Sequence, residues 1–135
     1  MDHLSRAKRS RNMAAIRSKN TKPEIEVRRF ISKAGLRYRL HVARLPGKPD
    51  IVFHRYRAVI FVHGCFWHGH KQCYRVPKSN VNYWFEKIQG NIKRDRKHIR
   101  GIQKLGWRVF KIWECNISEQ SVSKVVKDIK GGHLN

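Results

Sequence analysis

The sequence predicts an α/β protein with a mixed central sheet flanked by helices. Apolar residues recur at helical spacing in some segments, alternate or form short continuous runs in others, and the two kinds of segment follow one another along the chain. The predicted order is helix, three strands, helix, strand, helix. At 135 residues with 40% apolar composition, the chain suits one domain with one modest core. We therefore expect a basic N-terminal arm over residues 1–20 and a single domain over residues 21–135.

The first predicted helix has a clear start and stop. Thr21 is a suitable cap residue, Pro23 lies in the first turn and Glu24 follows three residues after the cap, as in a capping box. Gly35 ends the helical pattern. The period then changes to two, which predicts a strand over residues 36–42.

The remaining elements follow from the same patterns. Residues 50–53 form a short strand after a Pro-rich turn, and residues 58–62 form a continuous apolar strand of the kind that is buried on both faces. A long amphipathic helix is predicted over residues 83–104, a strand over 107–113 and a final helix over 118–130.

The charge of the chain points to a polyanionic partner. Lys and Arg number 31 against 9 Asp and Glu, a formal net charge of +22, and release of counterions from a phosphate backbone would drive binding. No apolar run approaches the roughly 20 residues of a membrane span, no signal peptide opens the chain, and no detached basic amphipathic helix suggests a membrane surface. Nucleic acid is the predicted partner.

Because acids are few, each can be weighed as a ligand for the Mg²⁺ that nucleases use. Asp50, at the mouth of a strand behind a Pro-rich turn, is the strongest candidate, and a turn Asp that satisfies backbone N–H groups is the alternative. From the residues alone Glu24 is better explained as a helix cap, although it could approach the same site. Asp95 lies on a helix rich in Lys and Arg, where ion pairing is the default expectation.

A Pro-Asp pair followed by a hairpin and a second strand resembles the core of restriction-endonuclease-like nucleases. Such cores carry an acid and a lysine on the second strand, whereas residues 58–62 contain neither. If Asp50 is catalytic, an imidazole must move the proton, and His63 and His68 follow directly. Either histidine could instead bind zinc or make a structural hydrogen bond.

Cysteines and histidines are concentrated in residues 63–73. Cys65 and Cys73 with one imidazole would supply three zinc ligands, and Cys115 could supply the fourth. His70 is the preferred imidazole because it lies between the two cysteines. Such a closed site would make the zinc structural; buried thiols beside surface histidines are the alternative.

Aromatic and basic residues provide candidate DNA contacts. Phe66 and Trp67 could stack on bases or cover the zinc site, and Trp84 has the same two interpretations. A basic face on the long helix favours phosphate contact. Its members are Lys87, Asn91, Arg94, Lys97, Arg100 and Lys104.

Several motifs, in order, resemble the very short patch repair (Vsr) endonucleases, over about residues 5–117. The matching segments are Arg9–Met13, Leu45–Asp50, Val59–His68, Phe85–Ile88, Asn91–Asp95 and Gly106–Cys115. The resemblance implies a restriction-endonuclease-like enzyme that nicks DNA on the 5′ side of the T in T·G mismatches, the products of 5-methylcytosine deamination. It further implies a bacterial, cytoplasmic, nucleoid-associated monomer that acts on double-stranded DNA and meets mismatch-repair proteins.

The resemblance also implies residue roles. Asp50 and the Val62 carbonyl would bind Mg²⁺, and His68 would act as general base or acid, supported by His63 and Glu24. Zinc would be held by Cys65, His70, Cys73 and Cys115. The residues expected beside the mismatch are Met13, Phe66, Trp67, Trp84, Lys87 and Asn91.

The sequence departs from the family pattern at two places, and two alternative functions stay open. Val62 stands where Thr is common, and the loop from His68 to Cys73 is one residue longer than expected. The chain could instead be a restriction or homing-type nuclease that cuts matched DNA, or a non-catalytic, zinc-stabilised DNA-binding module.

Overall fold

The structure, a computed structural model, describes residues 21–65, 68–70 and 79–132. Its elements are α2 (Lys22–Lys33), β1 (Arg39–Leu40), β2 (Ile51–Phe53), β3 (Ala58–His63), α3 (Val81–Lys104), β4 (Arg108–Trp113) and α4 (Glu119–Gly131). This confirms the predicted order of helix, three strands, helix, strand, helix. The predicted arm, residues 1–20, lies outside the described residues.

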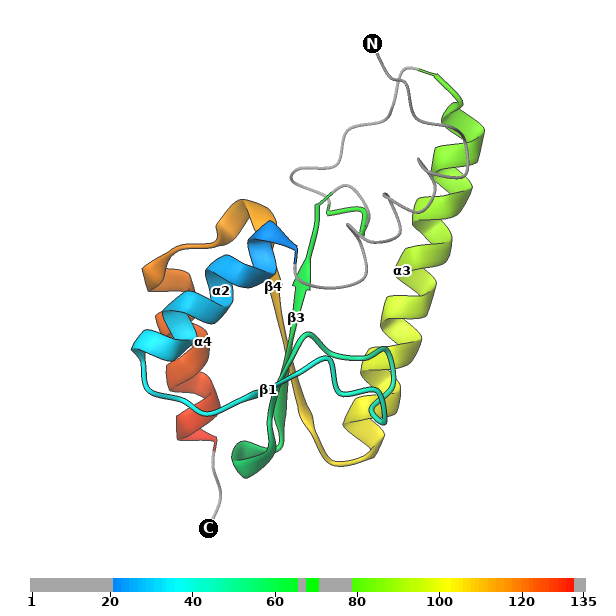
Figure 1. The fold of residues 1–135 in the computed structure, drawn as a ribbon. Coiled ribbons are helices and arrows are strands. Elements are labelled where there is room, and N and C mark those ends of the chain that lie inside the picture. The colour runs from blue at the N-terminus through cyan, green and yellow to red at the C-terminus, as the bar shows by residue number, and fades with distance from the viewer. Residues whose placement is uncertain (1–20, 66–67, 71–78, 133–135) are drawn as a thin grey trace.

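The strands form one mixed sheet in the order β1-β2-β3-β4. The β1–β2 and β2–β3 pairs are antiparallel, while β3 and β4 are parallel and joined through α3. Helices α2 and α4 cover one face of the sheet and α3 covers the other (Figure 1). A membrane-crossing helix is absent from the described part of the chain.

Strand β3 is buried on both faces, as its apolar run predicts. Ala58 and Ile60 pack into the cluster beneath α2 and α4, which also contains Ile31 and Val126. The intervening Val59 and Phe61 pack with Ile102 of α3 on the opposite face. Alternate side chains of this strand therefore pack into two different hydrophobic clusters, which explains why the segment has no polar residue before its end.

The predicted strand over residues 36–42 is wrong in length, because only Arg39 and Leu40 pair with β2. His41 has a φ of 49° and so leaves the extended conformation, although its N–H still donates to the Asp50 carbonyl at 3.2 Å. A left-handed residue cannot continue a strand, and this turn ends β1.

The sheet brings distant residues to one edge. Because β3 and β4 are parallel with His63 opposite Trp113, the residues that follow both strands emerge side by side. Because β2 is antiparallel to β3, the start of β2, where Asp50 lies, is also beside the end of β3. The candidate site is built at this edge.

Candidate active site

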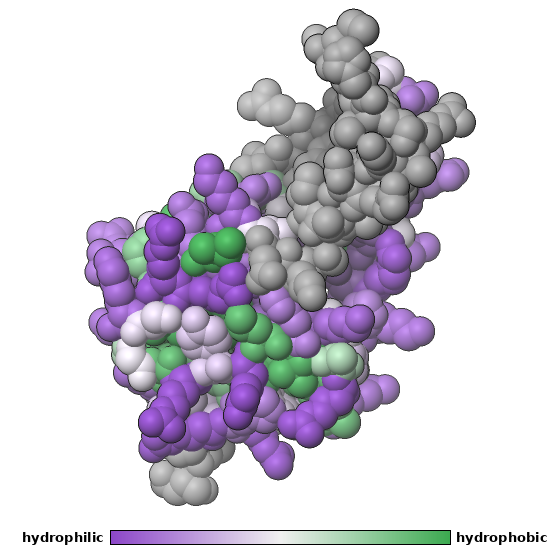
Figure 2. Space-filling view, in the orientation of Figure 1, coloured by the Kyte–Doolittle hydropathy of each residue, from purple (hydrophilic) through white to green (hydrophobic). Residues whose placement is uncertain are grey.

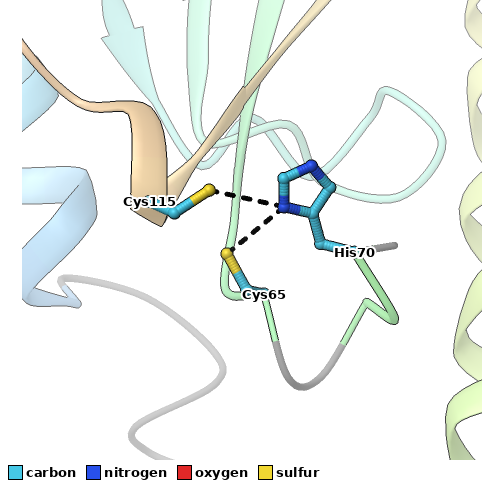
Figure 3. A group of neighbouring side chains, drawn as sticks. All are labelled: Cys65, His70 and Cys115. Atoms are coloured by element: carbon cyan, nitrogen blue, oxygen red, sulfur yellow. Dashed lines mark hydrogen bonds between the residues drawn. The ribbon is translucent and has the colours of Figure 1, made fainter. Parts of the chain in front are cut away.

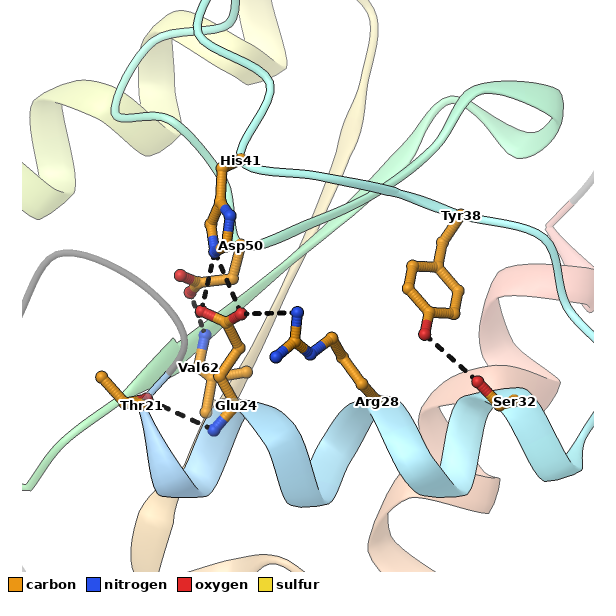
Figure 4. A network of polar contacts seen from close by, with 8 residues as sticks. All are labelled: Thr21, Glu24, Arg28, Ser32, Tyr38, His41, Asp50 and Val62. Atoms are coloured by element: carbon orange, nitrogen blue, oxygen red, sulfur yellow. Dashed lines mark hydrogen bonds and ion pairs between the residues drawn. The ribbon is translucent and has the colours of Figure 1, made fainter.

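Two acids from separate elements meet beside the end of β3 (Figure 4). Glu24 lies in the first turn of α2, where its N–H donates to the Thr21 side chain at 3.3 Å, and its residue is only 1% exposed. Asp50 accepts a 2.7 Å hydrogen bond from the Val62 N–H through Oδ2. The candidate ligand atoms of Glu24, His41 and Asp50 all lie within 4.8 Å of one another.

The Glu24 carboxylate has cationic or polar partners on its outer side. His41 Nε2 lies 3.0 Å from each of its two oxygens, and Arg28 lies 3.5 Å from Oε2 as the i+4 residue of the same helix. Thr21 does cap α2 as predicted, yet the Glu24 side chain contacts His41 and Arg28 and lies against Asp50. These side-chain contacts of Glu24 have no part in capping the helix.

The electrostatics of Asp50 favour a bound cation. Burial raises its pKa from the ordinary 3.8 to about 7; the Val62 N–H opposes the rise, the neighbouring Glu24 carboxyl adds to it and Arg28 lowers it. A buried carboxylate and a partly buried carboxylate that repel each other bind a proton or a divalent cation, and hard oxygen ligands suit Mg²⁺. The residues present therefore fit the predicted metal.

A histidine–aspartate pair lies on the α3 side of the same sheet edge. His68 Nδ1 is 2.5 Å from Asp95 Oδ2. The His68 ring stacks on His63, with centroids 3.8 Å apart and planes only 3° from parallel. Because a carboxylate only accepts hydrogen bonds, this contact favours a proton on Nδ1, which in the neutral ring leaves Nε2 as the acceptor nitrogen of His68.

His63 supports this pair as an uncharged ring. It is 4% exposed, and burial lowers its pKa to about 3, with a further reduction from neighbouring His68. Within the described chain its Nδ1 is buried without a hydrogen-bond partner. The rings line a pocket of about 380 Å³ that also includes Asp95 and the cations Arg96 and Lys111. Such a pocket suits an anionic group.

Cys65, His70 and Cys115 form a third cluster, past the ends of β3 and β4 (Figure 3). His70 Nδ1 lies 3.6 Å from the Cys65 sulfur and 3.4 Å from the Cys115 sulfur. Trp113 stacks on His70 at 4.1 Å, and Glu114 accepts the Cys65 N–H at 2.9 Å. Two thiols that converge on one imidazole nitrogen have the chemistry of a zinc site.

The other predicted residues have different outcomes. Trp84, Lys87 and Asn91 lie along the N-terminal half of α3. The remaining four predicted residues lie outside the described part of the chain. They are Met13, Phe66, Trp67 and Cys73.

Sequence reasoning missed two residues of the site. Asp95 was expected to form an ion pair on a basic helix; in the described part of the chain its partner is His68, which comes from another segment. A signal was present, since position 95 falls in the apolar stripe of α3 with Ile92 and Ile99, where an acid is out of place. His41 gave no such signal, because the sequence placed it inside the predicted strand over residues 36–42, whereas the observed strand ends at Leu40.

Three features together define a class of protein: a pair of neighbouring acids shielded from solvent in part, an imidazole held by a carboxylate, and a strongly basic chain. This combination of features is typical of nucleases, which hydrolyse phosphodiesters with a cation against the phosphate and a side chain that moves a proton.

Comparison with known proteins specifies the family. Residues 1–75 match the family described as DNA mismatch endonuclease Vsr. The chain is 47% identical over 116 residues to the DNA mismatch endonuclease Vsr of Escherichia coli K12, covering 84% of this chain and 74% of that protein. It is 43% identical over 136 residues to the type II nicking enzyme V.NmeAIP of Neisseria meningitidis, covering 96% of each. A similar enzyme from Xanthomonas oryzae, V.XorIIP, is 47% identical over 119 residues, or 87% of this chain and 88% of that one.

The chain therefore belongs to the Vsr DNA mismatch endonuclease family, as its motifs predict. It is a DNA endonuclease, a hydrolase of phosphodiester bonds, and the family implies a restriction-endonuclease-like fold.

Proposed function

We propose that this endonuclease nicks one strand of DNA on the 5′ side of the T in T·G mismatches left by 5-methylcytosine deamination, and so starts very short patch repair. The observation that carries the proposal is the presence of two groups of side chains at one edge of the sheet: the acids Glu24 and Asp50, and the His68–Asp95 pair. The mismatch substrate is supported by the name of the Escherichia coli relative. The cytoplasm of a bacterium, a monomeric state and mismatch-repair partners belong to the same proposal.

In the proposed mechanism Asp50, Glu24 and the Val62 carbonyl would hold Mg²⁺, which would supply positive charge against the scissile phosphate. His68 Nε2 moves the proton, as base toward water or as acid toward the leaving oxygen. Asp95 keeps the imidazole in the required tautomer, and the neutral His63 ring fixes its plane. The positions of both carboxyl groups and of the imidazole are thus set before DNA binds.

Zinc has a structural role in this proposal. Cys65, His70 and Cys115, with Cys73 as the fourth ligand, would close the coordination shell and leave no open position for substrate. His68 lies between Cys65 and His70 in the chain, and its N–H donates to the Gly64 carbonyl at 3.2 Å. A zinc ion that holds both sides of this short loop would fix the catalytic imidazole.

DNA contact is assigned to the basic surface and to α3. Hydrophilic residues dominate the face in Figure 2, and most of the charged residues in the chain are Lys or Arg. Lys87 and Asn91 are proposed to read the mismatched pair, and Trp84 to stack beside it. Met13, Phe66 and Trp67 are proposed to enter the base stack with it.

The proposed function is tested with labelled duplexes that carry either one T·G pair or T·A at the same position, incubated with Mg²⁺. We expect a single nick 5′ of the mismatched T, in that strand only, and no nick in the T·A duplex. An Asp50→Asn enzyme identifies any contaminating nuclease. Equal cutting of both duplexes would favour a nuclease for matched DNA, and binding without a nick across several flanking sequences would favour a DNA-binding module.

The histidine–aspartate pair makes a separate prediction. Asp95→Asn replaces the acceptor with an amide that can donate to Nδ1, so His68 is no longer held in the tautomer that leaves Nε2 free. We expect the single-turnover nicking rate to fall by about 10²-fold or more, within the range of general acid–base catalysis, with DNA affinity unchanged. Asp128→Asn, the same substitution at an exposed position of α4, is the matched control. A rate equal to that of the control would remove Asp95 from the mechanism.

A further inference from the structure

His41 connects the two acids of the site through two different parts of the residue. Its backbone N–H donates to the Asp50 carbonyl at 3.2 Å. Its imidazole Nε2 lies 3.0 Å from both oxygens of Glu24. The side chain is 20% exposed and the Glu24 side chain 2%, so this contact is shielded from water. One residue thereby spans the distance between α2 and the start of β2 (Figure 4).

The backbone of His41 is held in a costly conformation. A φ of 49° is left-handed, a conformation that a residue other than Gly adopts only at an energetic cost. The chain turns there, directly after the two paired residues of β1. The backbone bond to Asp50 and the ring contact to Glu24 are both made in this conformation. Strain retained beside a functional site is a reason to examine what it positions.

The geometry also separates a positioning role from a ligand role. Nε2 faces both Glu24 oxygens, so the edge of the ring that could bind a cation is already directed at the carboxylate. Arg28 takes a further position on Oε2. Oε1 therefore keeps a lone pair for a cation shared with Asp50, since a carboxylate offers about four acceptor directions.

The geometry points to His41 as a positioning residue: it orients the Glu24 carboxylate against Asp50 so that the two acids form one divalent-cation site. This inference rests on the proposed function, because it concerns the cation that the nuclease would use. It adds a residue outside the acids and the histidine–aspartate pair to the machinery.

Two amide substitutions test the inference. Gln places its amide nitrogen near the position of imidazole Nε2, whereas Asn is too short to reach Glu24. Asn tolerates the left-handed conformation better than Gln does. If His41 matters only for backbone stability, His41→Asn is the milder change. If it positions Glu24, His41→Gln is the milder change, so the two roles predict opposite orders.

The measurement is Mn²⁺ binding by electron paramagnetic resonance, on zinc-loaded protein without DNA, with Asp50→Asn defining the signal from this site. We expect His41→Asn to weaken Asp50-dependent Mn²⁺ binding by about 10-fold or more, the usual effect of losing a partner of a metal ligand. His41→Gln should stay close to wild type. His54→Asn is the control, because His54 is exposed and contacts Arg44. Melting temperatures of all four variants report the structural effect separately.

Nicking at graded Mg²⁺ gives the second readout. We expect His41→Asn to need more Mg²⁺ for half-maximal rate, with the rate at saturating Mg²⁺ largely restored. Unchanged Mn²⁺ affinity in His41→Asn, or no Asp50-dependent binding in wild type, would overturn the inference. Equal loss in both amide variants would overturn it too, because it would make the imidazole a direct ligand. Since Mn²⁺ binding needs no DNA, a failure to nick T·G duplexes would refute the proposed function without touching this result.

Discussion

Asp50→Asn is expected to abolish nicking while making the cation-free protein more stable at pH 8. Loss of the carboxylate would remove the proposed cation, whose stabilisation of charge at the phosphate is expected to contribute several kcal/mol. Because each 1.36 kcal/mol corresponds to a factor of ten, we expect the single-turnover rate on a T·G duplex to fall by about 10³-fold or more. Catalysis and stability should therefore change in opposite directions.

The stability gain follows from the raised pKa. Without a cation, the folded protein holds the Asp50 proton up to about pH 7, whereas an ordinary Asp loses it near 3.8. The folded state then binds more protons than the unfolded state between these values, so stability falls as pH rises through that window. Asn carries no such charge. We compare the free energy of unfolding of Asp50→Asn with that of wild type at each pH. The value for the variant minus the value for wild type should be about 2–3 kcal/mol larger at pH 8 than at pH 5.

Denaturant unfolding at pH 5 and pH 8, in buffer without added Mg²⁺, measures this difference. Titrating groups that do not interact with Asp50 behave alike in both proteins and cancel in the comparison. Asp128→Asn, on the exposed side of α4, should show no comparable pH effect. Added Mg²⁺ should stabilise wild type and leave Asp50→Asn unchanged. A stability difference between variant and wild type that is the same at pH 5 and pH 8 would show that the pKa of Asp50 is not raised in the folded protein.

The second large effect is expected from Cys115→Ser. Cys115 is exposed, and in a site without metal such a surface substitution changes stability by less than about 0.5 kcal/mol. In a zinc site it removes a ligand from an ion that contributes roughly 10–16 kcal/mol to folding in zinc-finger peptides. That exceeds the usual stability of a domain, about 5–15 kcal/mol. We therefore expect loss of zinc together with a large drop in melting temperature.

Zinc content of purified protein by mass spectrometry, and thermal unfolding, provide the readouts. Wild type should contain one zinc per chain, and stripping it with a chelator should reproduce the melting curve of Cys115→Ser. Ser123→Ala, at an exposed position of α4, is a control for a small surface change. If wild type contains no zinc and Cys115→Ser melts at the same temperature as wild type, the cluster is not a zinc site, and its thiols and histidine are simply packed together.

The fold could be predicted because local patterns agree with the final packing. The β3 segment is apolar on both faces because it packs beneath α2 and α4 on one side and α3 on the other. Thr21 and Gly35 mark the ends of α2 through local backbone chemistry alone. Such features depend on residues a few positions apart, and a sequence displays them directly.

The site could be predicted only in part, because its partners are far apart in the chain. Asp50 stood out by its position after a Pro-rich turn, whereas its neighbours Glu24 and His41 depend on how α2 and β1 dock. Asp95 joins His68 across 27 positions. Pairings of this kind are set by tertiary packing. The helical spacing of Asp95 marks it as an unusual acid in an apolar stripe, but it does not identify His68 as the partner.

The parallel pairing of β3 with β4 has a consequence for the synthesis of the protein. Strand β4 pairs with β3, and the Cys115 thiol that follows it contacts His70. Both are synthesised after more than three quarters of the chain. A ribosome-bound or truncated chain that ends before β4 lacks the strand with which β3 pairs. We therefore expect unfinished chains to have no nicking activity, and the nuclease to become active only after β4 has joined the sheet.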